Sequence, residues 1–586
     1  MTISHSNRSD YESAQAGGTG LDKEMPARSG RILGISGPTV STDLKGLKLY
    51  ERVYVGQALL TGEVVRLEKD KAVVQVYEDS RGLAVGEPVK GVGMPLTVRL
   101  GPGLLGGMFD GLQRPLERLR AEMGPFITGG KEMYALDYMK RWNFSPAKKP
   151  GDEVRPGDVM GTVQEGQFMH YIMAGLDESG TIERIVEGDV SLDEPLGEYA
   201  GGREIPGCHE WPVRIARPFR RKFAPHEPLI TGQRSIDFLF PLARGGTAIF
   251  PGGFGTGKTI LEQAVAKFAD VDIVVYVGCG ERGNEMADMI AEFEELKDPW
   301  TKRPLRERTV LVVNTSNMPV AAREASIYTA VTMAEYYRDM GYHVLFLADS
   351  LSRWAEALRE ISSSLEEMPG EEGYPTYLAS RLSGFMERAG VVETLAGRTG
   401  SLSMILSVSP PGGDFTEPVT QACLRTTGSF LMLDTALAHR RHYPAINWFQ
   451  SYSLYGAEVA GHYRTAVSPE WEGLLRRCRE MLQQEEALRE VAEIVGAEGL
   501  QNQDRLLMRT AEMIRTEFLQ QNAYSDDAFS PPEKTFATMK RIIDFFDAAS
   551  ARLKEGASLE EAMKGQESGD GSQKSGVGNV KQGAAS

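Results

Sequence analysis

The sequence lacks the features that mark several classes of protein. It has only four cysteines in 586 residues and no C-x-x-C pair, so we expect neither a zinc site nor a disulfide framework. We interpret the four as small apolar side chains: Cys208, Cys279, Cys423 and Cys478. No run of about 18 apolar residues occurs, so no transmembrane helix is predicted. The segment MTISHSNRSDYESAQAGG has no apolar core, so no secretory signal is expected.

Positively charged residues are also fewer than negatively charged ones. Lysine and arginine number 65 against 81 aspartates and glutamates, which gives a formal net charge of -16. Because an acidic surface disfavours binding of a polyanion, we do not expect nucleic acid as a partner. The hydrophobic share of 41% and the charged share of 25% are those of a globular protein. The length predicts roughly three or four domains.

A glycine-rich loop is the strongest chemical signal. The stretch FPGGFGTGKTILEQA contains the pattern G-x-x-x-x-G-K-[ST] from Gly252 to Thr259. A predicted strand, GGTAIF, precedes it and a predicted helix, TILEQAVAKFA, follows, which is the context that a phosphate-binding loop needs. Glycines let the backbone N–H groups and the helix N-terminus approach a phosphate. Lys258 would then supply positive charge to the β- and γ-phosphates, and Thr259 a hydroxyl to Mg²⁺.

Around this loop, near-continuous apolar runs alternate with helical stretches. Four runs are typical of parallel strands covered on both faces: VDIVVYVG (271–278), TVLVVN (309–314), HVLFLAD (343–349) and MILSVS (404–409). Asp349 ends the third run and would hold the water shell of the metal. Glu281 and Glu285 follow the first run, and both are candidates for the carboxylate that orients an attacking water.

The rest of the chain predicts three further parts. Short β-branched runs such as KAVVQVYED indicate a small barrel, a Gly- and Pro-rich stretch indicates a β module, and the C-terminal part is helical. The predicted fold class is an α/β P-loop NTPase core (RecA-like) with an N-terminal β-barrel, an inserted β-rich module and a C-terminal α-helical domain. The predicted parts are a disordered arm (1–29), the barrel (30–98), the inserted module (112–205), the core (99–111 and 206–450), the helical domain (451–564) and a disordered tail (565–586).

Several longer stretches resemble one family. They are GPGLLGGMFDGLQRPL, VYVGCGERGNEM, NTSNMPVAAREASIY, RWAEALREIS, LEEMPGEEGYP and SPPGGDFTEPVTQ. The chain resembles the catalytic A subunit of the vacuolar/archaeal-type rotary ATPase from about Gly30 to Asp544. The resemblance includes the inserted module.

The resemblance implies an enzyme that hydrolyses or makes ATP and couples this reaction to rotation of a stalk and to transport of H⁺ or Na⁺. It implies three A and three B subunits in a ring with catalytic sites at A–B interfaces, where the B subunit supplies an arginine finger. Central and peripheral stalk subunits and a membrane sector would be further partners. The chain would lie at the cytoplasmic face of a membrane as a peripheral subunit.

The resemblance also implies roles for individual residues. Glu281 becomes the water-activating carboxylate in preference to Glu285, and Arg282 lies near the γ-phosphate or orders Glu281. Thr259 and Asp349 hold Mg²⁺ through its water shell. The nucleotide, ATP or ADP, is bound by Gly252, Gly253, Phe254, Gly255, Thr256, Gly257, Lys258, Thr259 and Ile260. Adenine is held by the aromatic side chains of Tyr443, Tyr524 and Phe529.

The sequence departs from the family pattern at three places. Leu351 stands in ADSLSRW where the family has threonine, so a hydroxyl next to Asp349 is lost. Thr256 stands where eukaryotic members carry cysteine, so redox control there is not expected. The segment after Tyr524 is one residue shorter than is usual in the family, which bears on the role given to Phe529. The stretch HRRH (439–442) pairs two histidines with two arginines, which are poor metal ligands.

Two alternatives belong to other functional classes. A hexameric nucleic-acid translocase also combines a barrel with an ATPase core, but the acidic balance of the chain disfavours it. An inactive nucleotide-binding structural subunit predicts a degraded loop or a missing carboxylate, whereas Lys258, Thr259, Glu281 and Asp349 are all present.

Overall fold

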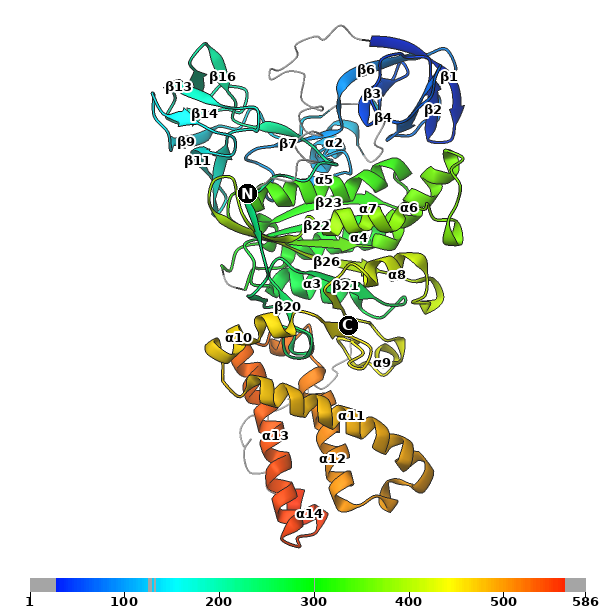
Figure 1. Cartoon of the computed structure of the whole chain (residues 1–586), viewed down its shortest axis with the longest axis vertical. Coiled ribbons are helices and arrows are strands. Elements are labelled where there is room, and N and C mark those ends of the chain that lie inside the picture. The colour runs from blue at the N-terminus through cyan, green and yellow to red at the C-terminus, as the bar shows by residue number, and fades with distance from the viewer. Residues whose placement is uncertain (1–27, 125–128, 131–132, 300, 564–586) are drawn as a thin grey trace, which may run out of the picture. The chain divides into compact units, whose positions relative to one another are not determined.

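The fold is that of a computed structural model, which describes residues 28–124, 129–130, 133–299 and 301–563. The predicted tail and all but the last two residues of the predicted arm lie outside the described residues. The chain forms two compact units. The first contains the described residues up to His462 together with Asn522–Phe529, and the second contains Tyr463–Gln521 and the described residues from Ser530 onward. Figure 1 shows the helices and strands, coloured along the chain.

A closed barrel of six antiparallel strands begins the first unit, with the order β1-β2-β5-β4-β3-β6. Alternate residues of β3 are buried, as expected when one face of each strand lines a barrel interior. Valines such as Val53, Val64 and Val74 fill that interior. The strands are β1 (Arg28–Ser36), β2 (Thr39–Thr42), β3 (Glu51–Val55), β4 (Leu60–Leu67), β5 (Ala72–Val76) and β6 (Pro88–Pro95).

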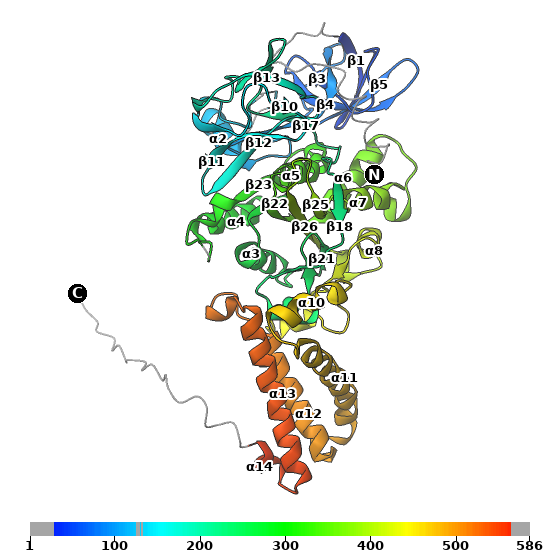
Figure 2. The same cartoon turned by 60° about the vertical axis from the view of Figure 1, so that its left-hand side comes forward.

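The inserted module, cyan to teal in Figure 2, consists of two four-stranded sheets. Their strand orders are β12-β11-β9-β14 and β10-β13-β15-β16. Buried aromatic side chains such as Trp142, Phe144 and Tyr199 form much of its core. Its strands are β9 (Trp142–Pro146), β10 (Glu153–Val154), β11 (Val159–Glu165), β12 (Phe168–Met173), β13 (Gly180–Ile185), β14 (Gly188–Val190), β15 (Gly197–Tyr199) and β16 (Arg203–Ile205). Helix α2 (Leu116–Met123) precedes the strands of the module, and β7 (Thr97–Leu100) pairs with β17 (His209–Pro212).

A ten-stranded sheet forms the core of the first unit, and its main path runs β28-β27-β21-β26-β24-β22-β23-β8. The central strands pair in parallel and are buried along nearly their whole length, as the apolar runs predicted. The strands of the path are β8 (Met108–Phe109), β21 (Thr247–Pro251), β22 (Ile273–Glu281), β23 (Thr309–Thr315), β24 (His343–Asp349), β26 (Thr399–Val408), β27 (Ser429–Phe430) and β28 (Tyr452–Ser453). Antiparallel β18 (Arg221–Phe223) and β25 (Gly390–Glu393) extend it, and β19 (Pro228–Leu229) pairs with β20 (Leu242–Ala243).

Helix α5 is buried on every side, because sheet strands, helix α6 and the strand β7 all pack against it. Its polar side chains are therefore paired, and Arg388 donates to Glu335 inside the protein. The helices of the unit are α3 (Lys258–Phe268), α4 (Gly283–Glu295), α5 (Val320–Asp339), α6 (Leu351–Ser364), α7 (Leu378–Met386), α8 (Pro418–Leu424), α9 (Thr435–His439) and α10 (Gly456–Ala466), the last of which continues into the second unit. Short helical turns are η1 (Ser235–Leu239), η2 (Leu305–Arg308), η3 (Glu371–Gly373), η4 (Pro411–Gly413) and η7 (Asp526–Ala528).

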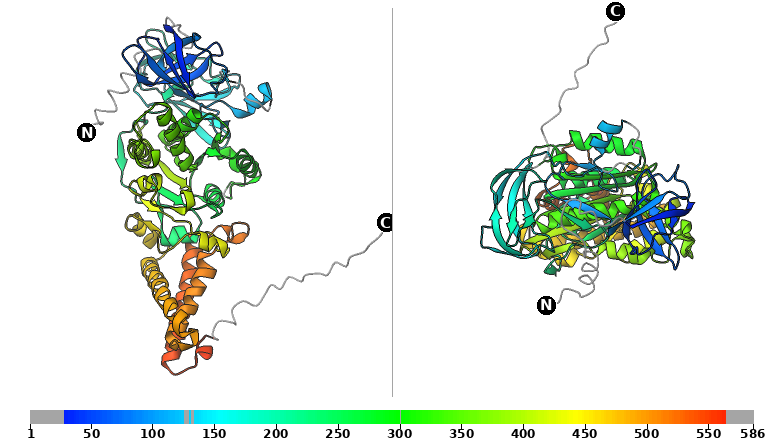
Figure 3. Two further views of the ribbon diagram at one scale, coloured as in Figure 1. Left: turned by 90° about the vertical axis from the view of Figure 1, so that its right-hand side faces the viewer. Right: turned by 90° about the horizontal axis from the view of Figure 1, so that it is seen from above.

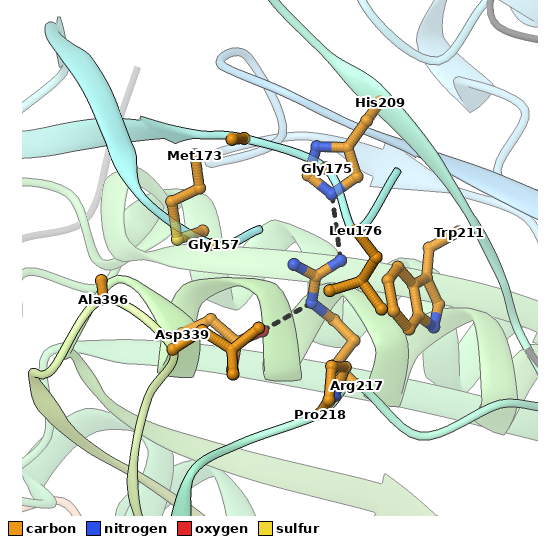
Figure 4. A pocket seen from close by; sticks show the side chains of 12 residues that line it. Gly157, Met173, Gly175, Leu176, His209, Trp211, Arg217, Pro218, Asp339 and Ala396 are labelled. Atoms are coloured by element: carbon orange, nitrogen blue, oxygen red, sulfur yellow. Dashed lines mark hydrogen bonds and ion pairs between the residues drawn. The ribbon is translucent and has the colours of Figure 1, made fainter. Parts of the chain in front are cut away.

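The side chain of Arg217 lies between Asp339, the last residue of α5, and the residues His209 and Trp211 of β17 (Figure 4). Its Nε donates to Asp339 Oδ2 at 2.6 Å, its Nη1 donates to His209 Nε2 at 3.0 Å, and its guanidinium lies 4.5 Å from the ring centroid of Trp211. Burial and the Arg217 charge hold the pKa of His209 well below its usual value. The cavity beside these residues is about 20 Å³, room for one water.

The second unit consists of helices α11 (Trp471–Val495), α12 (Asn502–Met513), α13 (Pro532–Lys554) and α14 (Leu559–Met563), with turns η5 (Ala497–Gly499) and η6 (Ile514–Leu519). Helix α13 packs against both α11 and α12 (Figure 3). The rings of Tyr463 and Trp471 stack at 4.3 Å, and Arg477 pairs with Asp547 between α11 and α13. None of the described helices is both long and apolar enough to cross a membrane.

The predicted fold class is confirmed: barrel, inserted β module, parallel sheet with its helices and helical C-terminal part are all present. The residue boundaries of the domains stay predictions.

Arg214 connects the barrel to helix α5 of the core. Its Nη2 donates to Glu63 of β4 at 3.0 Å, and its two terminal nitrogens donate to Glu324 of α5 at 2.8 and 3.0 Å. The side chains of Glu63 and Glu324 are almost fully buried. One cation therefore compensates two carboxylates that come from different parts of the chain.

We predict that Arg214→Met destabilises the first unit by about 3–5 kcal/mol, because it removes the cation that the buried Glu63 and Glu324 share and leaves Glu324 only the more distant Arg381, at 3.6 Å. The measurement is the midpoint of heat unfolding, followed by circular dichroism. Arg81→Met is the control, because Arg81 pairs with Asp79 on the exposed surface, and its midpoint should not change. Equal midpoints for the two variants would contradict the bridging role of Arg214.

Candidate active site

The glycine-rich loop joins β21 to α3 at one edge of the parallel sheet. Gly255 and Gly257 have φ angles of +77° and +83°, a region that side chains other than glycine rarely adopt. A Cβ atom at Gly252 would lie 2.7 Å from Leu433 Cβ, so this glycine permits close packing. Helix α3 begins at Lys258, and its first N–H groups face the loop. The loop thus has the backbone conformation of an anion cradle.

Lys258 lies across this loop. Its Nζ donates to the carbonyl oxygens of Gly252 and Gly253 at 2.7 and 2.9 Å. Burial lowers the pKa of Lys258, while the carboxylates of Asp349, Glu262 and Glu281 oppose this shift. These contacts hold the ammonium group next to the loop N–H groups, where it can bind a phosphate.

The other loop residues divide into buried and exposed ones. Thr256 is buried, and its Oγ1 donates to the Gly253 carbonyl at 2.9 Å, so it braces the loop. Phe254 is 88% exposed, and the guanidinium of Arg282 lies 5.9 Å from its ring centroid. Ile260 is also exposed. Phe254 and Ile260 therefore lie where a bound nucleotide or a neighbouring protein can cover them.

Asp349 ends β24 beside the loop helix. Its Oδ2 accepts from Thr259 Oγ1 at 3.2 Å, and its Oδ1 lies 3.2 Å from Ser407 Oγ. Burial raises the pKa of Asp349, against the effects of Thr259 and Lys258. The oxygens of Thr259 and Asp349 are the hard ligands that Mg²⁺ prefers, so the side chains present fit this ion. No group of three or more His, Cys, Asp or Glu side chains in the described residues forms a metal cluster.

Glu281 is the last residue of β22, and the parallel register places Gly278 of that strand opposite Asp349. Burial raises the pKa of Glu281 to about 8, and the negative charges of Asp349 and Glu285 add to the effect. Glu285 lies in the first turn of α4, and Arg282 Nη1 is 3.7 Å from its Oε1. Both competing carboxylates are thus near Asp349, but only Glu281 extends from a strand end.

The predicted aromatic residues lie in two places. Tyr443 borders the loop, since a Cβ at Gly257 would lie 3.2 Å from its ring. Tyr524 is 82% exposed, whereas the ring of Phe529 stacks on Phe268 at a centroid distance of 5.5 Å. Because Phe268 ends α3, Phe529 lies about 15 Å along the helix from the phosphate loop.

Two buried residues near Asp349 were not identified from the sequence. Ser407 Oγ lies between Asp349 and Glu262, and Glu262 is fully buried on α3. Burial raises the pKa of Glu262 well above its usual value, with a further contribution from Asp349. The sequence offered one sign of Glu262, because this glutamate stands among the apolar positions of the predicted helix TILEQAVAKFA. The reason for its burial is visible only once β26 lies beside α3.

Leu351, the departure next to Asp349, is completely buried among core side chains of α6. Its side chain therefore serves packing, and the hydroxyl groups next to Asp349 come from Thr259 and Ser407. His442 of the HRRH stretch lies against Trp448 at a ring distance of 5.8 Å.

Four family profiles match the chain in order. They are the beta-barrel domain of the ATP synthase alpha/beta family (32–93), the barrel-sandwich domain of the alpha/beta subunits (133–214), the nucleotide-binding domain of the same family (232–453) and the C-terminal domain of V and A type ATP synthase (460–563). The matches include parts of the barrel, the inserted module, the core sheet and the C-terminal helices, and residues 94–132, 215–231 and 454–459 lie between them.

Whole-chain relatives are also found. The chain is 51% identical to the second A subunit of the A-type ATP synthase of Methanospirillum hungatei, over 91% of this chain and 92% of the relative. It is 52% identical to the A subunit of the A-type ATP synthase of Methanopyrus kandleri, with coverage of 91% and 92%. It is 50% identical to the V-type ATP synthase alpha chain of Clostridium botulinum, with 92% of each covered.

Among solved structures, the assembled ATPase EscN from the type III secretion system of enteropathogenic E. coli matches with a TM-score of 0.63. The match covers 88% of this chain and 100% of that chain at 22% identity, so it shows a shared fold alone.

We predict that Lys258→Met weakens ADP binding about 10- to 100-fold, because a charge-assisted contact to phosphate is lost. Titration calorimetry measures the affinity. Lys267→Met is the matched control: Lys267 lies in the last turn of the same helix, with its Nζ 4.9 Å from the Phe268 ring centroid. Unchanged ADP affinity in Lys258→Met would contradict phosphate binding at this loop.

Proposed function

The chain belongs to the family of catalytic A subunits of A/V-type rotary ATP synthases, and from this membership we propose that the residues at the edge of its parallel sheet carry out ATP turnover. The observation that supports this proposal is the convergence of Lys258, Asp349 and Glu281 from three different segments. The carboxyl ends of parallel strands are where α/β proteins bind ligands.

In the proposed reaction, the loop N–H groups and Lys258 bind the β- and γ-phosphates of ATP. The carboxylate of Glu281 accepts a hydrogen bond from a water and aligns it with the γ-phosphorus. The water oxygen attacks that phosphorus, the bond to the β–γ bridging oxygen breaks, and ADP and phosphate are formed. Synthesis is the reverse at the same site. Arg282, beside Glu281, orders this carboxylate or lies near the γ-phosphate.

Thr259 and Asp349 would hold Mg²⁺ through its water shell, and the ion, when bound, neutralises charge on the phosphate oxygens. Asp349 is oriented for this role by hydroxyl contacts on both of its oxygens, from Thr259 and Ser407. Tyr443 and Tyr524 would take the adenine between aromatic surfaces, with Phe529 closing the pocket from its stack on Phe268.

We further propose that the site is completed by a non-catalytic B subunit, which supplies an arginine finger in an alternating ring of three A and three B subunits. An arginine supplied in trans stabilises charge in the transition state and ties chemistry to the arrangement of subunits. Stalk subunits and a membrane ion-translocating sector would complete the machine, with this chain peripheral at the cytoplasmic face. The family membership favours this function over a nucleic-acid translocase or an inactive structural subunit.

We predict that Glu281→Gln lowers kcat for ATP hydrolysis about 10²- to 10⁴-fold while ADP binding is retained, because only the water-orienting carboxylate is lost. Glu285→Gln is the matched control and should reduce kcat far less. The assay uses the chain mixed with the B subunit from the same source, and the chain alone should be nearly inactive. A larger effect of Glu285→Gln would reverse the assignment, and full activity without the B subunit would contradict the shared site.

We also predict a pH dependence of kcat/KM. The raised pKa of Glu281, about 8, means that this carboxyl holds a proton in the nucleotide-free protein at neutral pH. Because the reaction needs the carboxylate, kcat/KM should rise about tenfold per pH unit up to this pKa and level off above it. Hydrolysis rates at low ATP from about pH 6 to pH 9 measure the profile. A flat profile would show that no group with this pKa limits the reaction.

A further inference from the structure

The loop Asn522–Phe529 belongs to the first unit, although the chain on both sides of it belongs to the second. Residues 463–521 separate it from the preceding part of the first unit, so its place there depends on tertiary contacts. We call residues 522–529 the anchored loop. It contains Tyr524, one of the proposed adenine contacts.

An ion pair attaches the anchored loop. Both terminal nitrogens of Arg234 donate to Asp527, Nη1 to Oδ1 and Nη2 to Oδ2, the latter at 2.8 Å. The Arg234 side chain is 3% exposed, and that of Asp527 is 36% exposed. A bidentate pair of this kind fixes orientation as well as distance, and a buried guanidinium without its carboxylate is costly.

Two further contacts lie next to the ion pair. Gln233 Nε2 donates to the Ala528 carbonyl at 3.0 Å. The ring of Phe529 stacks on Phe268 at an interplanar angle of 24° and packs against Gly232. A Cβ at Gly232 would lie 2.2 Å from Phe529 Cδ2, so this approach requires glycine. The contacts that hold the anchored loop thus reach α3, the helix that begins at the phosphate loop.

The surface that receives the loop is itself held in place. Asp237 accepts hydrogen bonds from the Thr231 N–H and Oγ1 through one oxygen and from the Gly232 N–H through the other. These bonds span 2.7–2.9 Å and fix the turn that precedes Gln233 and Arg234. Asp237 is buried, so the turn is part of the core of the unit.

Tyr524 lies three residues before Asp527 and has a largely exposed side chain. Its own N–H donates to Asn522 Oδ1 at 2.9 Å, and Ser525 Oγ accepts from the Asp527 N–H at 3.2 Å. These local bonds connect Tyr524 to the anchored residues 527–529 by a short, hydrogen-bonded stretch. The backbone position of Tyr524 therefore depends on the anchored residues 527–529.

We propose that Arg234 and Asp527 are positioning residues for the base of the nucleotide. They hold Tyr524 in register with the phosphate loop, so that the aromatic surface for adenine belongs to the same unit as the phosphate site. This inference rests on the proposed role of Tyr524 as an adenine contact. The ligand class is a nucleoside di- or triphosphate, and only the contribution of its base depends on the pair.

The test compares ADP with inorganic pyrophosphate, which lacks the base. Asp527→Asn keeps the size of the side chain and removes its charge. We expect about tenfold weaker ADP binding, because the loop must then be ordered by the ligand, and unchanged pyrophosphate binding. The control Asp526→Asn changes the neighbouring exposed acid of the same turn and should bind both ligands normally. Arg234→Lys keeps the charge without the two-pronged geometry and should act in the same direction as Asp527→Asn.

A double-variant comparison separates the two proposals. If Asp527 acts through Tyr524, Asp527→Asn should weaken ADP binding in the unchanged protein but have almost no further effect in Tyr524→Ala. If Tyr524→Ala weakens ADP binding and Asp527→Asn does not, the positioning role is wrong and the base contact stands. If Tyr524→Ala leaves ADP binding unchanged, the proposed base contact fails, and the positioning role with it. Equal weakening of ADP and pyrophosphate binding by Asp527→Asn would indicate general disruption and overturn the inference.

Discussion

The site depends on a parallel sheet that is buried on both faces and whose strands end at one edge. The registers of β21, β26, β24 and β22 bring their carboxyl ends to that edge: Pro251 pairs with Val408, Asp349 lies opposite Gly278 of β22, and Glu281 lies three residues beyond Gly278. Burial of the strands leaves the edge as the place where polar groups can meet a ligand. The positions of the glycine-rich loop, of Asp349 at the end of β24 and of Glu281 at the end of β22 all follow from this arrangement.

The same burial determines the charge state of the site. Glu262, Glu281 and Asp349 all lie near Lys258, and desolvation raises the pKa of each carboxyl. Carboxyl groups so close together cannot all be ionised without nearby cations. The site is therefore suited to a cation and to the gain and loss of protons, and the hydroxyl of Ser407 connects two of the three acids.

Arginines join segments that are distant in sequence. Arg214 links the barrel to α5 through two buried glutamates, and Arg234 links the core to the anchored loop through Asp527. In each case the planar guanidinium donates from both terminal nitrogens, which fixes orientation better than an ammonium group could. The unit that binds nucleotide is therefore assembled from pieces before and after residues 463–521.

The amino-acid pattern alone determined the class of the fold and the identity of the loop. Apolar runs such as HVLFLAD can be buried on both faces only in a covered parallel sheet, and GGFGTGKT has the glycines that a phosphate cradle needs, so local chemistry was sufficient for Gly252–Thr259. The pattern could not separate Glu281 from Glu285, identify Ser407 or Glu262, or relate Arg234 to Asp527. Those relations join residues up to 293 positions apart, and only the packing of the strands and the docking of the anchored loop bring them within contact distance. Short-range periodicity carries no information on such pairings, because burial and hydrogen bonding between distant segments are properties of the folded chain.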